Sequence, residues 1–115
     1  MQFEGIFTPI VTPYHNDFSL NCDALAETVE HLIAAGVHGI VVAGSTGEYY
    51  AQDPEERLEM MAKCAGLIDG RVPVVIGTGA IRTEDSIMYA KAAKEAKAAE
   101  EKAAKEAAAA AKKKA

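Results

Sequence analysis

The chain has 115 residues, of which half are hydrophobic and a quarter are charged, and its formal net charge is −5. This length and composition predict one soluble globular domain or a piece of one. The acidic balance gives no electrostatic reason to expect nucleic acid as a partner. No apolar run approaches membrane-spanning length, and the first residues lack the basic flank and apolar core of a signal peptide. We therefore expect a cytoplasmic protein with no membrane partner.

Three short apolar runs predict buried strands. Residues 5–13 read GIFTPIVTP, residues 39–44 read GIVVAG and residues 72–79 read VPVVIGTG. Their apolarity is continuous rather than alternating, which indicates strands covered on both faces, as in a parallel sheet. Successive runs begin about 33 residues apart, the length of one strand-helix unit.

Helical patterns separate these runs. The first helix is predicted from Leu25, Val29, Leu32 and Ile33, which share one helix face, and Gly36 ends it.

The second helix has a clear start signal. Asp53 is a suitable N-cap, Pro54 suits the first helical position, and Glu55 and Glu56 suit the positive end of the helix dipole. We expect the helix to end at Gly70. Its predicted inner face consists of Leu58, Met61, Cys64, Ala65 and Ile68.

A third helix is predicted from Thr83, with Ile87, Met88 and Ala92 facing inward. Residues 97–115 consist of ten Ala, six Lys and three Glu, so this segment has a net charge of +3 and the rest of the chain −8. Alanine, lysine and glutamate are strong helix formers. The third helix is therefore expected to continue to about residue 112 as a low-complexity tail similar to a helical spacer.

The order of elements is strand-helix repeated three times, which predicts an α/β fold with parallel strands and right-handed crossovers. A fourth strand would begin about 33 residues after the third. The alanine-rich tail stands there instead, so we place a domain boundary between residues 1–96 and 97–115. Three strands leave two open sheet edges, which predict a homo-oligomer or pairing with a complementary fragment.

The stretch AGSTGE, residues 43–48, directly follows the second apolar run. A glycine turn at the carboxyl end of a parallel strand frees backbone N–H groups, and the hydroxyls of Ser45 and Thr46 add further donors. Barrel enzymes place their active sites at this end of their strands, and such a nest of donors suits a carboxylate or phosphate. Glu48 is expected to order the turn.

GIFTPIVTP, GVHGIVVAGSTGE, ERLEMM and GRVPVVIGTGA, in this order, resemble the start of the dihydrodipicolinate synthase and N-acetylneuraminate lyase family. The resemblance covers residues 3–96 and is most specific at the G-[ST]-T-G-E box. It implies the first three units of a (β/α)₈ TIM barrel, with the last helix extended by the tail. Family members bind pyruvate or another 2-oxo acid as a Schiff base and catalyse aldol-type condensation, cleavage or dehydration.

The resemblance also implies roles for residues of the turn. Thr46 would hold the carboxylate of the 2-oxo acid, with the backbone through Gly47 completing the substrate-binding site. Ser45, where the family often has threonine, would bind substrate and pass a proton in a relay with tyrosines. No cofactor is implied.

Two other patterns in the sequence do not indicate a binding site. Residues 77–82, GTGAIR, follow a strand and open a helix as a dinucleotide-binding loop does. Arginine replaces the third glycine of that fingerprint, however, and no acidic ribose partner follows. His15, His31 and His38 lack metal-ligand spacing, so no metal site is predicted.

The imine-forming lysine of the family lies on the sixth strand and its tyrosine partner on the fifth. Lys63, Lys91 and Lys94 lie on predicted helices, and the other lysines lie in the tail. None has an evident means of lowering its pKa, so the chain alone is expected to be inactive. The alternative is an engineered structural or assembly protein that joins a barrel fragment to a helical spacer.

Overall fold

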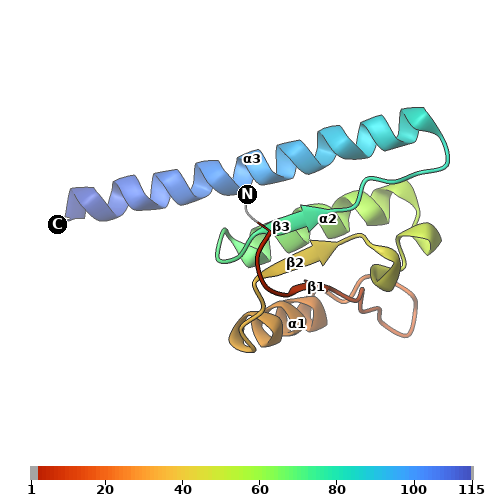
Figure 1. The fold of residues 1–115 in the computed structure, drawn as a ribbon, viewed down its shortest axis with the longest axis horizontal. Helices are drawn as coiled ribbons and strands as arrows, with labels where there is room; N and C mark the ends of the chain where they lie inside the picture. Colours follow the sequence, from red (N-terminus) through yellow and green to blue (C-terminus); the bar gives the residue numbers. More distant parts are fainter. Residues whose placement is uncertain (1–2, 115) are drawn as a thin grey trace.

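The computed structural model describes the backbone of residues 3–114 and the side chains of residues 3–99. Its centre is a parallel sheet of three strands, β1 (Phe7–Pro9), β2 (Gly39–Val42) and β3 (Val74–Ile76), in the order β1-β2-β3 (Figure 1). The three predicted strands are therefore confirmed, although each is shorter than its apolar run. β2 is the central strand.

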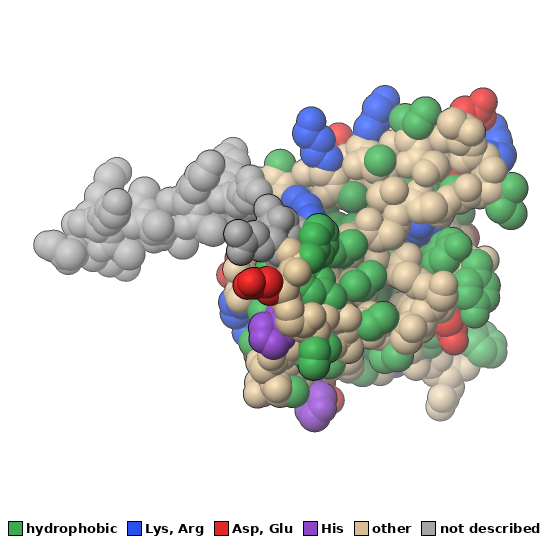
Figure 2. All heavy atoms as spheres, in the orientation of Figure 1, with side chains coloured by type: hydrophobic (Ala, Val, Ile, Leu, Met, Phe, Trp, Pro, Cys, Tyr) green, Lys and Arg blue, Asp and Glu red, His purple; other side chains and the backbone are tan. Residues whose placement is uncertain are grey.

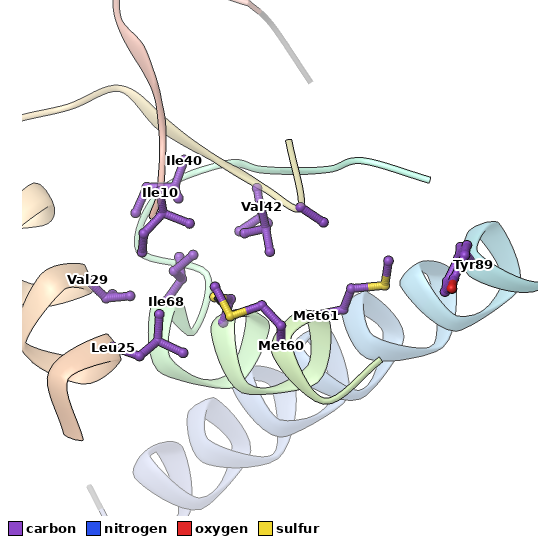
Figure 3. Close-up of a cluster of buried hydrophobic side chains, with 12 residues drawn as sticks. Ile10, Leu25, Val29, Ile40, Val42, Met60, Met61, Ile68 and Tyr89 are labelled. Carbon is purple, nitrogen blue, oxygen red and sulfur yellow. Dashed lines mark hydrogen bonds between the residues drawn. The ribbon is translucent and has the colours of Figure 1, made fainter. Parts of the chain in front are cut away.

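The helices cover one face of the sheet more completely than the other. Ile40 and Val42 of β2 and Val74 of β3 are buried and belong to the main hydrophobic cluster, and Figure 3 shows Ile40 and Val42 with the helical side chains of that cluster. Val41 and Val75, which are register partners on the opposite face, are only half-buried. The helices therefore cover one face, while the face that would line a barrel stays partly open.

Helix α1 spans Cys22–Ala34. Its N-cap is Asn21, whose side chain accepts a hydrogen bond from the Ala24 N–H at 3.0 Å, satisfying one of the free donors at a helix start. Leu25 and Val29 are fully buried, as predicted. The chain leaves the helix through Gly36, which has φ +87°.

Helix α2 spans Pro54–Ile68. The predicted N-cap is confirmed, because the Asp53 carboxylate accepts a hydrogen bond from the Glu56 N–H at 2.9 Å. The end differs by one residue from the prediction: Asp69 itself takes the left-handed conformation, with φ 51°, before Gly70. Aspartate tolerates this region better than most residues.

The inner face of α2 includes two side chains that we did not predict. Arg57 and Met60 are 3% and 1% exposed, whereas Leu58, predicted to face inward, is only partly buried. α2 lies between α1 and α3 and packs on β2 and β3, so its inner face forms much of the core (Figure 1).

Helix α3 spans Thr83–Lys114, which confirms one continuous helix through the tail. Its predicted inner face is wrong: Ile87 and Met88 are 50% and 39% exposed, while Tyr89 and Ala93 are buried. Tyr89 packs against the buried Arg57 guanidinium of α2, which places this side of α3 inward and leaves Ile87 and Met88 outside. Of the helices in the described chain, none has the length and apolarity needed to cross a membrane.

Candidate carboxylate-binding site

The AGSTGE segment forms a tight turn at the carboxyl end of the central strand. Ser45–Gly47 is a short 3-10 helix (η1) that follows β2, and Tyr49–Ala51 forms a second one (η2). Ala43 and Glu48 flank η1 with φ values of 57° and 61°. Positive φ is uncommon for residues other than glycine and persists where the surrounding structure holds it.

The turn leaves several hydrogen-bond donors free. The N–H groups of Gly47 and Glu48 donate to the carbonyls of Gly44 and Ser45, at 3.1 and 3.0 Å. The N–H groups and hydroxyls of Ser45 and Thr46 have no hydrogen-bond partner among the described residues, and both residues are exposed. Two backbone donors and two hydroxyls are thus available to an anion at this strand end.

The end of β1 holds the turn from one side. The buried Thr12 hydroxyl donates to the Gly47 carbonyl at 2.7 Å, and Gln52 Nε2 lies 3.3 Å from the same hydroxyl and donates to the Tyr14 hydroxyl at 3.1 Å. A Cβ on Gly47 would lie 3.1 Å from the Ile10 carbonyl oxygen. Glycine at position 47 therefore allows the turn to pack closely against the end of β1.

The end of β3 holds the turn from the other side. The Gly77 N–H donates to the Val42 carbonyl at 2.8 Å. A Cβ on Gly77 would lie 2.3 Å from the carbonyl oxygen of Ala43, just before the turn. Gly77 thus serves the close packing of β3 against β2, which gives a structural reason for this glycine other than dinucleotide binding, whereas a Cβ on Gly79 would meet nothing within 4 Å.

Arg57 ties this loop to α2. Its guanidinium donates to the carbonyls of Gly77 and Gly79, at 3.0 and 2.8 Å, and its carbon lies 4.7 and 4.0 Å from the ring centres of Tyr49 and Tyr89. Buried cations are stable when hydrogen-bonded and stacked on aromatic rings. We missed Arg57 because arginine usually lies at the surface, although it is four residues before Met61, on the predicted inner face.

A cleft of about 650 Å³ lies next to the turn, between η2, the start of α2 and the start of α3. Tyr49, Gln52, Arg57 and Tyr89 line it, whereas Ser45 and Thr46 do not. The free donors of the turn therefore face outside this cleft and stand exposed. No group of three or more His, Cys, Asp or Glu side chains in the described part of the chain could hold a metal ion.

Residues 2–100 match the model of the dihydrodipicolinate synthetase family. The chain belongs to this family. The 4-hydroxy-tetrahydrodipicolinate synthase of Methanoculleus marisnigri is 43% identical over 97 residues, which are 83% of this chain and 33% of that protein. The protein of the same name from Ehrlichia canis is 37% identical over 87 residues, which are 76% of this chain and 29% of that protein.

Solved structures agree in fold. A putative dihydrodipicolinate synthetase from Pseudomonas aeruginosa superposes with a TM-score of 0.81 at 29% identity, over 83% of this chain and 33% of that one. A prophage protein of the family from E. coli K12, in complex with pyruvate, superposes with a TM-score of 0.81 at 34% identity, over 84% of this chain and 32% of that one. N-acetylneuraminate lyase from Mycoplasma synoviae superposes with a TM-score of 0.78 at 35% identity, over 83% of this chain and 33% of that one.

The family resemblance and the TIM-barrel fragment predicted from the sequence are therefore confirmed. The chain spans about a third of the length of its curated relatives. The binding and relay roles of Ser45, Thr46 and Gly47 stay predictions, as does the division between residues 1–96 and 97–115.

Proposed function

We propose that the chain is the N-terminal part of a lyase that binds pyruvate or another 2-oxo acid as a Schiff base, for aldol condensation, cleavage or dehydration. The observation that carries this proposal is the set of free donors on Ser45 and Thr46 at the carboxyl end of β2. Two structural relatives, from E. coli and Acinetobacter baumannii, are in complex with pyruvate, which supports a 2-oxo acid as the ligand of this site.

The free donors suit a carboxylate in number and type. One carboxylate oxygen accepts from the N–H groups of Ser45 and Thr46, and the other accepts from the Thr46 hydroxyl. The Ser45 hydroxyl then lies beside the ketone end and can pass a proton. Imine formation requires an amine that attacks the C2 carbonyl carbon and releases water, and the lysine that does so in the family comes from a later strand.

This chain alone is inactive in our proposal. Lys63, Lys91 and Lys94 are exposed on helices, away from the buried surroundings that turn a lysine into a nucleophile. A few neutral hydrogen bonds contribute about 1 kcal/mol each, and they barely exceed the entropy lost when a small ligand is immobilised. The chain therefore binds pyruvate with a dissociation constant of about millimolar or weaker.

The open sheet gives the chain a reason to associate. β1 and β3 have no further strand beside them among the described residues, and Phe3, Ile6 and Val11 are exposed by 74%, 67% and 50%. Unpaired edges and exposed apolar side chains favour association. We propose a homo-oligomer or a complementary barrel fragment as the partner. A second candidate function, structural assembly through the long helix, is supported by the continuation of α3 to Lys114.

Borohydride reduction tests the catalytic part of the proposal. The 115-residue chain is incubated with pyruvate, reduced and analysed by mass spectrometry, and no stoichiometric adduct is expected. The same treatment is applied after mixing with a C-terminal segment of the Methanoculleus marisnigri enzyme that supplies the remaining barrel units. An adduct on a lysine of that segment would support a complementary partner. A stoichiometric adduct on the chain alone would contradict the proposal.

A further inference from the structure

One outer stripe of α3 is exposed in the described structure, and Glu84 at its start is paired only with the exposed Arg82. Glu84, Met88, Lys91 and Glu95 follow one another at helical spacing, and all are exposed. Beside them a shallow groove of about 390 Å³ runs between α3 and Leu58 of α2. Figure 2 shows basic and hydrophobic side chains together along the edge of the molecule where α3 lies in Figure 1. The stripe points away from the inward face formed by Tyr89 and Ala93.

The stripe continues along the backbone of the same helix. At 3.6 residues per turn, the positions that share this face beyond Glu95 follow directly from the helix geometry. They are Ala98 and Ala99 on either side of its midline, then Lys102, Glu106, Ala109 and Lys113. The whole stripe thus contains three acidic, three basic and four apolar positions.

The charges of this stripe would pair with those of a second copy of the stripe that runs in the opposite direction. When it is reversed about the midpoint between Ala98 and Ala99, position 84 meets 113, 91 meets 106 and 95 meets 102. Each pair joins an acidic with a basic residue. The remaining pairs, Met88 with Ala109 and Ala98 with Ala99, are apolar. A parallel arrangement in register would instead place each charge opposite an identical charge.

We propose that two copies of this chain associate through these stripes, with their α3 helices antiparallel about a two-fold axis at Ala98 and Ala99. Each surface patch then meets its own copy, as a two-fold interface requires. Alanine at the axis allows the helix backbones to approach closely. The far half of each α3 lies over the groove beside Leu58 in the other copy. This inference is independent of the carboxylate site, because it uses residues of α3 and its groove alone.

Charge reversal tests the pairing. In the two-fold dimer, Glu95→Lys creates two like-charge contacts with position 102. We expect the dimer dissociation constant from sedimentation equilibrium to rise about tenfold. The swap Glu95→Lys with Lys102→Glu restores both pairs and is expected to restore the dimer. Glu101→Lys, the same substitution on the same helix but outside the stripe, is the matched control and leaves the dimer unchanged. Circular dichroism checks that all variants keep their helix content.

Spin labels test the direction of the helices. In a Cys22→Ser background, labels at positions 101 and 108 lie off the stripe, and the buried Cys64 stays unlabelled. The antiparallel pair predicts that the two labels at 101 are close, whereas those at 108 are separated by about 30 Å along the axis, at 1.5 Å rise per residue. Equal distances at both positions would overturn the arrangement. So would a monomer at millimolar concentration, or equal effects of Glu95→Lys and Glu101→Lys.

Discussion

The guanidinium carbon of Arg57 lies 4.0 Å from the centre of the Tyr89 ring, and both side chains are buried. This contact joins α2 to α3, while the same guanidinium holds the carbonyls of Gly77 and Gly79. One side chain therefore connects two helices and the loop after β3, and that loop packs against the residue that precedes the candidate site.

Replacement of the buried Arg57 by methionine is expected to lower the free energy of unfolding by about 2–4 kcal/mol, because the carbonyls of Gly77 and Gly79 lose charge-assisted hydrogen bonds. Urea denaturation followed by circular dichroism measures this loss. Arg82→Met is the matched control. Arg82 is exposed and its ion-pair partner is the exposed Glu84, so a change within about 0.5 kcal/mol is expected. Equal losses in the two variants would contradict the role of Arg57.

Substitution Gly77→Ala tests the close approach of β3 to β2. The new Cβ would lie 2.3 Å from the Ala43 carbonyl oxygen, so backbone must move, at an expected cost of about 1–3 kcal/mol. The amide resonances of Ser45 to Glu48 should shift as well, because Ala43 leads directly into the turn.

The control for this variant is Gly66→Ala. Gly66 lies within α2 and a Cβ there meets nothing within 4 Å. Alanine at this position is expected to stabilise the protein by about 0.5–1 kcal/mol. If Gly77→Ala were as well tolerated as Gly66→Ala, the packing account of the glycine loop would be wrong.

The ion pair between Glu30 and Arg71 predicts how the pKa of Glu30 and the stability of the fold depend on this contact. Arg71 donates two hydrogen bonds to the Glu30 carboxylate, at 2.6 and 3.0 Å, and this lowers the pKa of Glu30 below its ordinary value of 4.5. Because the folded-state pKa is lowered, the pair stabilises the fold above about pH 4.5, and its contribution is lost as the pH falls through the lower value.

Carboxyl carbon resonances followed against pH report this titration. Arg71→Ala is expected to return the pKa of Glu30 to its ordinary range. The pKa of Asp17, which is lowered chiefly by a hydrogen bond from the Ser19 hydroxyl, should stay unchanged in the same variant. A Glu30 midpoint that does not move would contradict the ion pair.

Much of the fold follows from local signals in the sequence. Asp53 before Pro54 fixes the start of α2, and continuous apolar runs identify the three strands, because capping and burial act through neighbouring residues. The inward face of α3 could not be read in this way. Ile87 and Met88 are the largest aliphatic residues of that helix, but Tyr89 and Ala93 are buried. Tyr89 packs on Arg57 of α2, and such a tertiary contact leaves no local signal in the sequence.

The candidate site was predictable in part. The position of Ser45 and Thr46 after the central strand follows from the order of the strands. Their support does not, because Thr12 bonds Gly47 of the turn across 35 residues, and Arg57 bonds Gly77 of the adjoining loop across 20 residues. A regular helix face did contain the signal for Arg57, since position 57 precedes Met61 and Cys64 at helical spacing.

Titration of pyruvate, followed through the amide resonances of Ser45 to Glu48, tests the central claim most directly. The account predicts specific shifts at these amides with a midpoint of about millimolar or higher. Thr46→Val should abolish them, while Lys63→Ala, an exposed change on α2, should leave them unaltered. Saturation at micromolar pyruvate, or unchanged binding in Thr46→Val, would contradict a weak carboxylate site built from this turn.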